Sequence, residues 1–227
     1  MSRRPAVRVC VVAPSRSITP EMAETVRLLA AAGPARRLDI VFHPQCFLVE
    51  NHFAGPDDAR LNALVEAAND PDFDAIWFAR GGYGAGRIAA QAMARFGAAA
   101  RSKQYLGYSD AGFLFAGMYR AGFAQLAHGP MPGDLRRSGG EAAVSRALAY
   151  LAGEDTGLEP SVGRLPAPLA AFNLTVLAHV CGTGLAPDLA GHILYLVDLG
   201  EYHYRFDRAF SQIMSQPGAP RLAGLRL

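Results

Sequence analysis

Residues 103–113, with the sequence KQYLGYSDAGF, place a serine where a strand gives way to a helix. Gln104–Gly107 has the composition of a strand, Gly107 offers a turn, and Ala111–Ala121 has the composition of a helix. At this corner Ser109 would project its hydroxyl above the sheet edge, beside the N–H groups that the first turn of a helix leaves free. Such N–H groups can stabilise a developing oxyanion. The stretch predicts a nucleophile at Ser109, or else a helix N-cap, since serine and aspartate are favoured there for the same N–H groups.

The same succession of strand, turn and helix runs through the first 150 residues. It predicts an α/β fold, in which a mostly parallel sheet carries helices on both faces. Three strands, Val7–Val12, Phe73–Ala79 and Gln104–Gly107, are expected as neighbouring or near-neighbouring central strands. The other expected strands are Leu38–Phe42 and Ala124–Ala127, and the other expected helices are Pro20 to about Gly33, Pro56–Ala68, Gly84–Phe96 and Glu141–Leu151.

Four polar or glycine-containing segments follow strands of this predicted sheet. They are Pro14-Ser15, Arg80-Gly81-Gly82, Ser109-Asp110 and His128-Gly129. Ligands of parallel sheets bind at the carboxyl ends of the strands. We therefore expect these four segments to form one site.

The chain divides by composition into two domains and a linker. Residues 1–152 form the predicted α/β domain, and residues 153–168, rich in glycine, proline and charge, are a predicted linker. Residues 169–227 are expected to form a smaller, partial C-terminal α/β domain. Its predicted elements are a helix at Leu174–Cys181, a strand at His192–Val197, a helix at Tyr204–Met214 and an interrupted strand at 221–227.

Composition excludes several classes of function. The 227 residues are 51% hydrophobic and 19% charged, which is ordinary for a globular protein. The net charge of +2 argues against a nucleic-acid surface, and the pair Arg136-Arg137 is interpreted as solvated surface. The three cysteines, Cys10, Cys46 and Cys181, have no metal-ligand spacing, and we expect neither disulfides, metal nor cofactor. No run of about 20 apolar residues is present, so a cytoplasmic protein without a membrane partner is expected.

Several motifs together resemble the LD-carboxypeptidases, the serine peptidase family that includes muramoyltetrapeptide carboxypeptidases and microcin-immunity peptidases. The motifs are APS at 13–15, RGGYG at 80–84, GYSD at 107–110 and HGPM at 128–131. The resemblance continues through FNL at 172–174 and ILYLVDLGE at 193–201. It implies a flavodoxin-like sheet followed by a smaller domain. A nucleotide-binding flavodoxin-like protein is the more remote alternative, because no G-x-G-x-x-G or P-loop follows the first strand.

The resemblance implies a serine hydrolase that releases a terminal D-amino acid from L,D-linked muropeptides during peptidoglycan recycling. Ser109 would be the nucleophile, and the backbone N–H groups of Gly82 and Asp110 would form the oxyanion hole. Substrate-binding positions would be Arg80, Tyr83 and His128. Arg80 suits a free carboxylate, although a structural ion pair is the alternative. The family also allows a homodimer, and a hydrolase of peptide–nucleotide antibiotic conjugates is a second activity within it.

The sequence departs from the family at the other two members of the triad. The position of the family's catalytic glutamate holds Val197, and Asp198 would point to the opposite face of a continuing strand. Glu201 would lie about 13 Å from that position, at about 3.3 Å per residue. The family's histidine lies beyond residue 227, and His128 is the nearest substitute for it.

Three other histidines are assigned to structural positions. His179 is interpreted as a core histidine, and His192 and His203 as strand-edge and surface residues. Two hypotheses follow from the unmatched base. The chain is a shortened form of a longer enzyme, or it is a catalytically impaired homologue that retains muropeptide binding.

Overall fold

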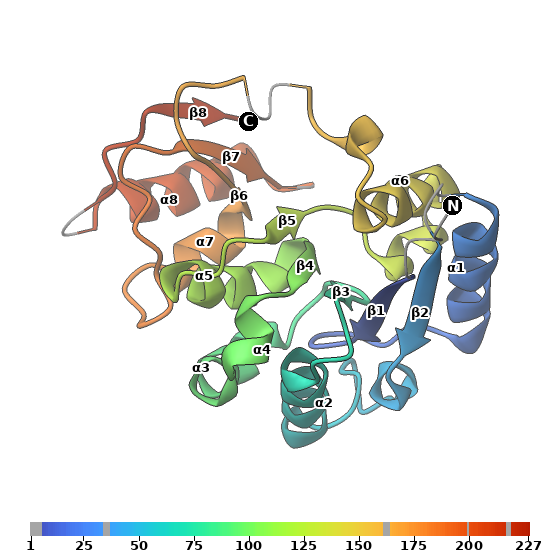
Figure 1. Cartoon of the computed structure of the whole chain (residues 1–227). Coiled ribbons are helices and arrows are strands. Elements are labelled where there is room, and N and C mark those ends of the chain that lie inside the picture. The colour runs from blue at the N-terminus through green and yellow to red at the C-terminus, as the bar shows by residue number, and fades with distance from the viewer. Residues whose placement is uncertain (1–5, 34–36, 161–163, 199, 217–218) are drawn as a thin grey trace.

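The computed structural model describes residues 6–33, 37–160, 164–198, 200–216 and 219–227. Its elements form two parallel sheets, each with its own helices (Figure 1). In the first unit these are β1 (Val7–Val12), α1 (Pro20–Ala32), β2 (Leu38–Phe42), the 3₁₀ helix η1 (Pro44–Phe47), α2 (Asp57–Asn69), β3 (Ala75–Phe78), α3 (Ala85–Arg95), α4 (Ala98–Arg101), β4 (Gln104–Gly107), η2 (Ser109–Ala111), α5 (Gly112–Arg120), β5 (Leu126–His128), η3 (Pro132–Arg136) and α6 (Gly140–Leu151).

The larger sheet has five strands in the order β2-β1-β3-β4-β5, and every pairing is parallel. This is the strand order of flavodoxin-like sheets. The three strands expected at the centre, β1, β3 and β4, are direct neighbours, which confirms the prediction. The chain moves from β1 outward to β2 and then returns to the other side with β3, so the carboxyl ends of β1 and β3 flank the switch in strand order, where ligands of such sheets bind.

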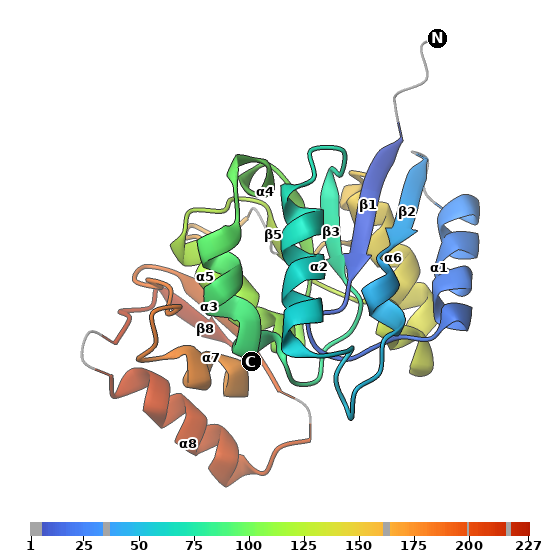
Figure 2. The ribbon, with the colours of Figure 1, turned by 90° about the horizontal axis from the view of Figure 1, so that it is seen from below.

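Alternating side chains of the strands build two hydrophobic layers. In β1, Val9 and Val11 pack with α1 and α6, whereas Cys10 and Val12 pack with α2, α3 and α5. Helices thus cover both faces of the sheet, as expected (Figure 2). The first helix begins as its sequence indicated, because the Thr19 hydroxyl accepts a hydrogen bond from the Met22 N–H at 3.3 Å.

The smaller sheet has the parallel order β6-β7-β8. Its elements are β6 (Leu169–Asn173), α7 (Leu174–Val180), β7 (Ile193–Val197), α8 (His203–Met214) and β8 (Gly224–Arg226), preceded by the 3₁₀ helix η4 (Asp155–Gly157). Neither β6 nor the short α4 was predicted from the sequence. The interrupted strand predicted at 221–227 corresponds to β8, which pairs with β7.

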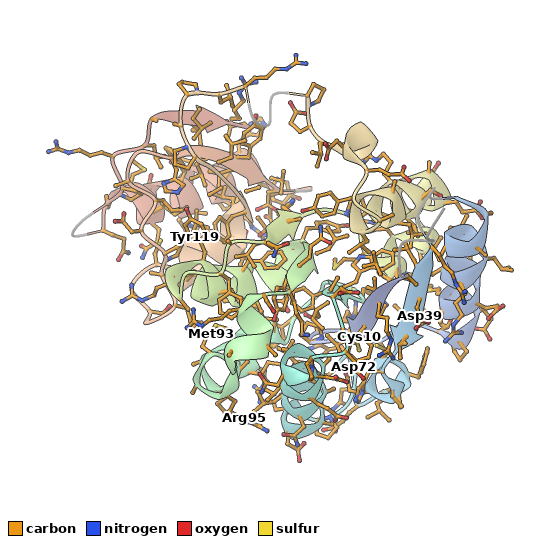
Figure 3. The ribbon with its side chains drawn as sticks, viewed as in Figure 1. Cys10, Asp39, Asp72, Met93, Arg95 and Tyr119 are labelled. Carbon is orange, nitrogen blue, oxygen red and sulfur yellow. The ribbon has the colours of Figure 1, made fainter. Side chains whose placement is uncertain are left out.

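The two units pack through α5 and α7. Ala116 of α5 is buried in the same hydrophobic cluster as Leu174 and Leu177 of α7. The last turn of α5 adds a polar contact between the units. The hydroxyl of Tyr119, labelled in Figure 3, forms a hydrogen bond of 2.6 Å with Nε2 of His192. The contact places the carboxyl end of β7 beside that of β4.

Candidate active site

Ser109 stands at the corner that its sequence predicted, with an unusual backbone. β4 ends at Gly107, η2 begins at Ser109, and α5 follows from Gly112. Ser109 has a φ of +62°, in the left-handed region that non-glycine residues rarely occupy. Such a conformation costs about 1–3 kcal/mol and persists only where the surroundings enforce it. The sequence held no signal of this conformation beyond the turn itself.

The glycines after β3 lie against Ser109. A Cβ on Gly81 would stand 3.0 Å from Oγ of Ser109, so the Gly81 backbone packs directly on the serine side chain. Gly82 has a φ of +125°, and a Cβ there would stand 2.4 Å from Cδ of Arg16. Within the described chain, the backbone N–H groups of Gly82 and Asp110 donate to no protein acceptor. Both groups are free for the oxyanion role that the sequence analysis assigned to them.

Ser109 lines two adjoining pockets. The large pocket, of about 630 Å³, also contains His128 and reaches the second unit at Asn173, Val197 and Asp198. The second, which we call the basic pocket, has about 240 Å³ and contains Arg80, Gly81 and Gly82. Tyr108, Ser109, Asp134 and Arg137 line both. The predicted segments after β3, β4 and β5 therefore meet at Ser109.

The Asp110 carboxylate ties three strand-end loops together. Its Oδ2 accepts a hydrogen bond from the Ser15 hydroxyl at 2.5 Å and one from the Ala85 N–H at 2.8 Å. Ser15 follows β1, Ala85 begins α3, and Asp110 follows β4. Burial raises the pKa of Asp110, whereas these two donors act to lower it. The Asp110 carboxylate therefore has a structural role, and its backbone N–H is the group that could donate to an oxyanion.

Arg60 of α2 donates hydrogen bonds to the loops that follow β1 and β3, a role that was not predicted from the sequence. The side chain is fully buried, and it donates to the backbone carbonyls of Pro14, Gly55 and Gly84 and to the Asp57 carboxylate. The Nη1 to Gly84 oxygen distance is 3.0 Å. An arginine one turn into a helix looks like surface in a sequence, and only the fold brings three loop carbonyls to it.

The loop after β5 is held by Asp134. Its Oδ1 accepts a hydrogen bond from the Tyr108 hydroxyl at 2.6 Å, and its Oδ2 accepts the Met131 N–H at 2.9 Å. Burial and the hydrogen bond to Asp134 raise the pKa of Tyr108 to about 12, so the phenol stays neutral. The Trp77 indole of β3 donates to the Pro130 carbonyl at 2.8 Å, which fixes the other end of the loop.

His128 lies on β5 directly opposite Gly107 of β4 and lines the large pocket. Its Nε2 is buried and has no hydrogen-bond partner among the described residues. Burial lowers the pKa of His128 to about 4, so the imidazole is neutral at pH 7. A neutral imidazole of this kind is a weak proton acceptor, because an efficient base has a pKa near the working pH.

Arg80 and Tyr83, both predicted to contact substrate, lie in different surroundings. Arg80 lines the basic pocket, and its Nη1 donates to the Ser17 carbonyl at 3.4 Å rather than to a carboxylate. Tyr83 is 51% exposed and lies near the rings of His52 and Phe53, outside the lining of both pockets at Ser109. Its contact with substrate stays a prediction.

The second unit contributes the end of β7. Val197 is 42% exposed and faces the large pocket, and Asp198 lines the same pocket. The expected alternation would have turned Asp198 away, but β7 ends at Val197 and the alternation stops there. The Asp198 carboxylate accepts hydrogen bonds from Thr175 Oγ1 at 2.9 Å and Asn173 Nδ2 at 3.4 Å. Glu201 instead pairs with Arg205, away from both pockets.

His179, His192 and His203 do not line either pocket at Ser109. His179 was expected in the core and is exposed, with Nδ1 2.6 Å from the Thr175 carbonyl oxygen. His192 is buried against Tyr119 rather than at a strand edge, and His203 is exposed as expected. Among the described residues, no group of three or more His, Cys, Asp and Glu side chains could hold a metal ion. The described helices include none that is long and apolar enough to cross a membrane.

Known proteins resemble the chain in sequence and in fold. The chain is 32% identical to the murein tetrapeptide carboxypeptidase of Pseudomonas aeruginosa, over 97% of this chain and 75% of that protein. It is 29% identical to a probable murein peptide carboxypeptidase of Bacillus subtilis, over 90% of this chain and 66% of that protein. The crystal structure of muramoyltetrapeptide carboxypeptidase from Oxalobacter formigenes has the same fold, with a TM-score of 0.73 at 22% identity, over 95% of this chain and 74% of that one.

Family models match both units of the chain. The model of the LD-carboxypeptidase N-terminal domain matches residues 9–129, which include the predicted nucleophile and both predicted oxyanion N–H groups. The model of the LD-carboxypeptidase C-terminal domain matches residues 167–227. Together with the P. aeruginosa relative, these matches show that the chain belongs to the LD-carboxypeptidase family.

Proposed function

We propose that this protein is a serine hydrolase that releases a terminal D-amino acid from L,D-linked muropeptides, with Ser109 as its nucleophile. The observation that carries the proposal is the position of Ser109, strained at φ +62° where two pockets meet. Strain of this kind gathers at functional sites. The names of the P. aeruginosa and B. subtilis relatives supply the substrate class.

In the proposed reaction, Ser109 Oγ adds to the carbonyl carbon of the scissile amide and loses its proton to a base. The N–H groups of Gly82 and Asp110 would stabilise the resulting oxyanion. The protonated leaving amine would depart with the terminal residue, and water would then hydrolyse the acyl-serine. The large pocket has room for the acyl part of the peptide, since ligand pockets commonly have roughly 300–1,000 Å³.

A second candidate function is muropeptide binding with little turnover. It is favoured by the surroundings of Ser109, where His128 has its pKa lowered to about 4 and Val197, at the position that the resemblance assigns to the family's glutamate, lines the large pocket. A serine hydroxyl is a weak nucleophile without a base. In serine proteases, removal of one triad member leaves a rate roughly 10³–10⁴-fold above that of the reaction in water. Slow turnover by the 227-residue chain is therefore the expected outcome.

The test is release of D-alanine from an L,D-linked muropeptide tetrapeptide. Ser109→Ala is the blank, and Ser102→Ala, an exposed serine before β4 at the opposite edge of the sheet, is the matched control. We expect slow release that Ser109→Ala abolishes and Ser102→Ala leaves unchanged. Release that survives Ser109→Ala, or an absence of both release and muropeptide binding, would refute the proposal. Rapid release that depends on Ser109 would identify an efficient base, with His128 the first residue to test.

The proposed role in peptidoglycan recycling would place the protein in the cytoplasm, where recycled muropeptides are processed. Residues 1–152 and 169–227 would act as two domains that close the large pocket between them, with 153–168 as a linker. η4 at Asp155–Gly157 gives part of that linker a defined structure. A homodimer remains a proposal, which light scattering of the purified chain would test.

A further inference from the structure

Four arginines from three loops converge on the basic pocket. Arg16 follows β1, Arg80 follows β3, and Arg136 and Arg137 stand at the end of η3. Ser109 lines the same pocket. Arg136 and Arg137 are exposed, as predicted from the sequence, and they also line this pocket.

Three of these guanidinium groups have no carboxylate partner in the described chain. Arg16, Arg80 and Arg136 donate to the backbone carbonyls of His52, Ser17 and Gly133, at 3.4, 3.4 and 3.2 Å. No described carboxylate oxygen lies within 4 Å of any of the three. Buried Arg60 is different, because Asp57 neutralises it.

The carboxylate nearest to this cluster is already engaged. Asp134 lies 3.6 Å from Arg137, and it accepts hydrogen bonds from the Tyr108 hydroxyl and the Met131 N–H. Burial, and then the charges of Arg136, Arg16 and Arg137, lower the pKa of Arg80. The four groups therefore repel one another, and a protein of net charge +2 concentrates an excess of positive charge at this one place.

We propose that the basic pocket is an oligoanion subsite, which binds a group carrying two or more negative charges next to Ser109. One forked guanidinium is enough for one carboxylate. Three unpaired guanidiniums exceed what the single terminal carboxylate of a peptide requires. The subsite would take an acidic carboxy-terminal residue, with its main-chain and side-chain carboxylates, or a phosphate ester.

The size of the basic pocket agrees with a small occupant. Its volume of about 240 Å³ lies below the roughly 300–1,000 Å³ of pockets for drug-sized ligands, so it suits a group of about one residue. The large pocket on the other side of Ser109 would then hold the acyl part. This assignment of the two sides rests on the proposed function, whereas binding of the anion itself does not.

The backbone around Gly82 is shaped to bring Arg16 into the pocket. A Cβ on Gly82 would stand 2.4 and 2.6 Å from Cδ and Cγ of Arg16, so only glycine allows the aliphatic part of Arg16 to lie there. Gly133 does the same for Arg80, since a Cβ there would stand 2.7 Å from Cγ of Arg80. The lack of a Cβ at these two glycines thus leaves room for the side chains of two of the four arginines.

The experiment is calorimetric titration of the chain with D-glutamate, inorganic phosphate and D-alanine. We expect D-glutamate or phosphate to bind at least about 10-fold more tightly than D-alanine, because charge-assisted hydrogen bonds add about 1.5–3 kcal/mol each. Arg80→Gln and Arg136→Gln should each weaken that binding by about 10-fold. Tightest binding of D-glutamate identifies an acidic terminal residue as the occupant, and tightest binding of phosphate identifies a phosphate ester.

Arg95→Gln is the matched control. Arg95 is exposed at the last turn of α3, and α3 begins at Ala85 beside the carboxyl ends of the strands, so Arg95 stands at the opposite edge of the sheet. Binding should be unchanged in this variant. Arg136 is exposed, so its replacement leaves the core intact even if the Arg80 variant folds poorly. Raised sodium chloride should weaken the wild-type binding, because salt screens exposed charges.

Three outcomes would overturn the subsite: D-alanine binding as tightly as both anions, no binding of either anion at millimolar concentration, or binding that Arg95→Gln weakens as much as Arg136→Gln. The D-alanine release assay on the wild-type chain, run beside these titrations, separates this proposal from the proposed function. Anion binding without D-alanine release would retain the subsite and refute the hydrolase. Release without anion binding would do the reverse.

Discussion

The two sides of the large pocket are built in different ways. The side that carries Ser109 is tied together by buried polar groups: Asp110 joins Ser15 to Ala85, and Asp134 joins Tyr108 to Met131. The side formed by the end of β7 presents Val197, which is 42% exposed, and its helix α8 has Ile213 as its buried residue. The first side is cross-linked by buried polar groups, whereas the second exposes the side chain of Val197 to the pocket.

The difference shows which side of the pocket has its geometry fixed by buried hydrogen bonds. A serine at φ +62° keeps that conformation only if several neighbours enforce it. Preorganised donors are effective in catalysis because they need not rearrange during the reaction. The cross-linked side meets that requirement for the nucleophile and the oxyanion, whereas at the end of β7 the described hydrogen bonds join Asp198 to Thr175 and Asn173 and the Val197 side chain stays partly exposed.

Arg60→Met should have the largest effect on this contrast. The change removes the donors to the Pro14, Gly55 and Gly84 carbonyls, and we expect the free energy of unfolding to fall by about 3–5 kcal/mol, as for a broken buried ion pair. Chemical denaturation would measure it. Arg205→Met, an exposed member of the pair with Glu201 on the β7 side, should change nothing measurable. Equal losses in the two variants would contradict the contrast.

His128 should make stability depend on pH. Its pKa is lowered from 6.5 to about 4 in the folded chain, so between these values the unfolded chain binds a proton that the folded chain does not. Stability should therefore decrease as pH falls from about 6.5 to 4, by up to about 3 kcal/mol, and this contribution should level off below pH 4. Denaturation of wild type and His128→Gln across this range measures the difference. His203→Gln, on the exposed start of α8, should behave like wild type.

Gly82→Ala should damage the cross-linked side more than a matched change elsewhere. Alanine would be strained at φ +125° and would also displace Arg16, so we expect a loss of about 1–3 kcal/mol in stability together with weaker anion binding. Gly191→Ala, before β7 at φ +72°, meets no atom within 4 Å and should cost strain alone, about 1 kcal/mol. Anion binding that survives in Gly82→Ala would show that Arg16 is dispensable.

Val197→Glu should have the smallest effect. A glutamate there would face the large pocket and, in the proposed mechanism, would act only by orienting a base; His128, whose pKa is lowered to about 4, is the histidine that lines this pocket among the described residues. We expect D-alanine release to change by less than about 2-fold, because a residue that acts only through a weak base gains little by its own presence. A large gain in rate would show that His128 is already the base and needed only the carboxylate.

Much of the fold could be predicted from the chain alone, because the strands are short apolar runs bounded by turn residues. The predicted bounds of Val7–Val12 and Gln104–Gly107 match the structure, whereas Ala124–Ala127 begins two residues before the observed β5. β6 was missed because Leu169–Asn173 follows Pro166 and Pro168 and contains two alanines, which are weak strand signals. It forms because pairing with β7 satisfies its backbone.

The sequence by itself determined the order of elements, the corner at Ser109 and the glycines that adjoin it, since periodicity and turn chemistry are local. Only the tertiary structure decided that Arg16, Arg80, Arg136 and Arg137 share one pocket, and that buried Arg60 holds three loops. These residues lie far apart in the chain, and a charge on a loop has the same local signal whether it faces solvent or a pocket. The physical reason is convergence: parallel strands bring every loop at their carboxyl ends to one edge, and the packing of helices then selects which side chains meet there.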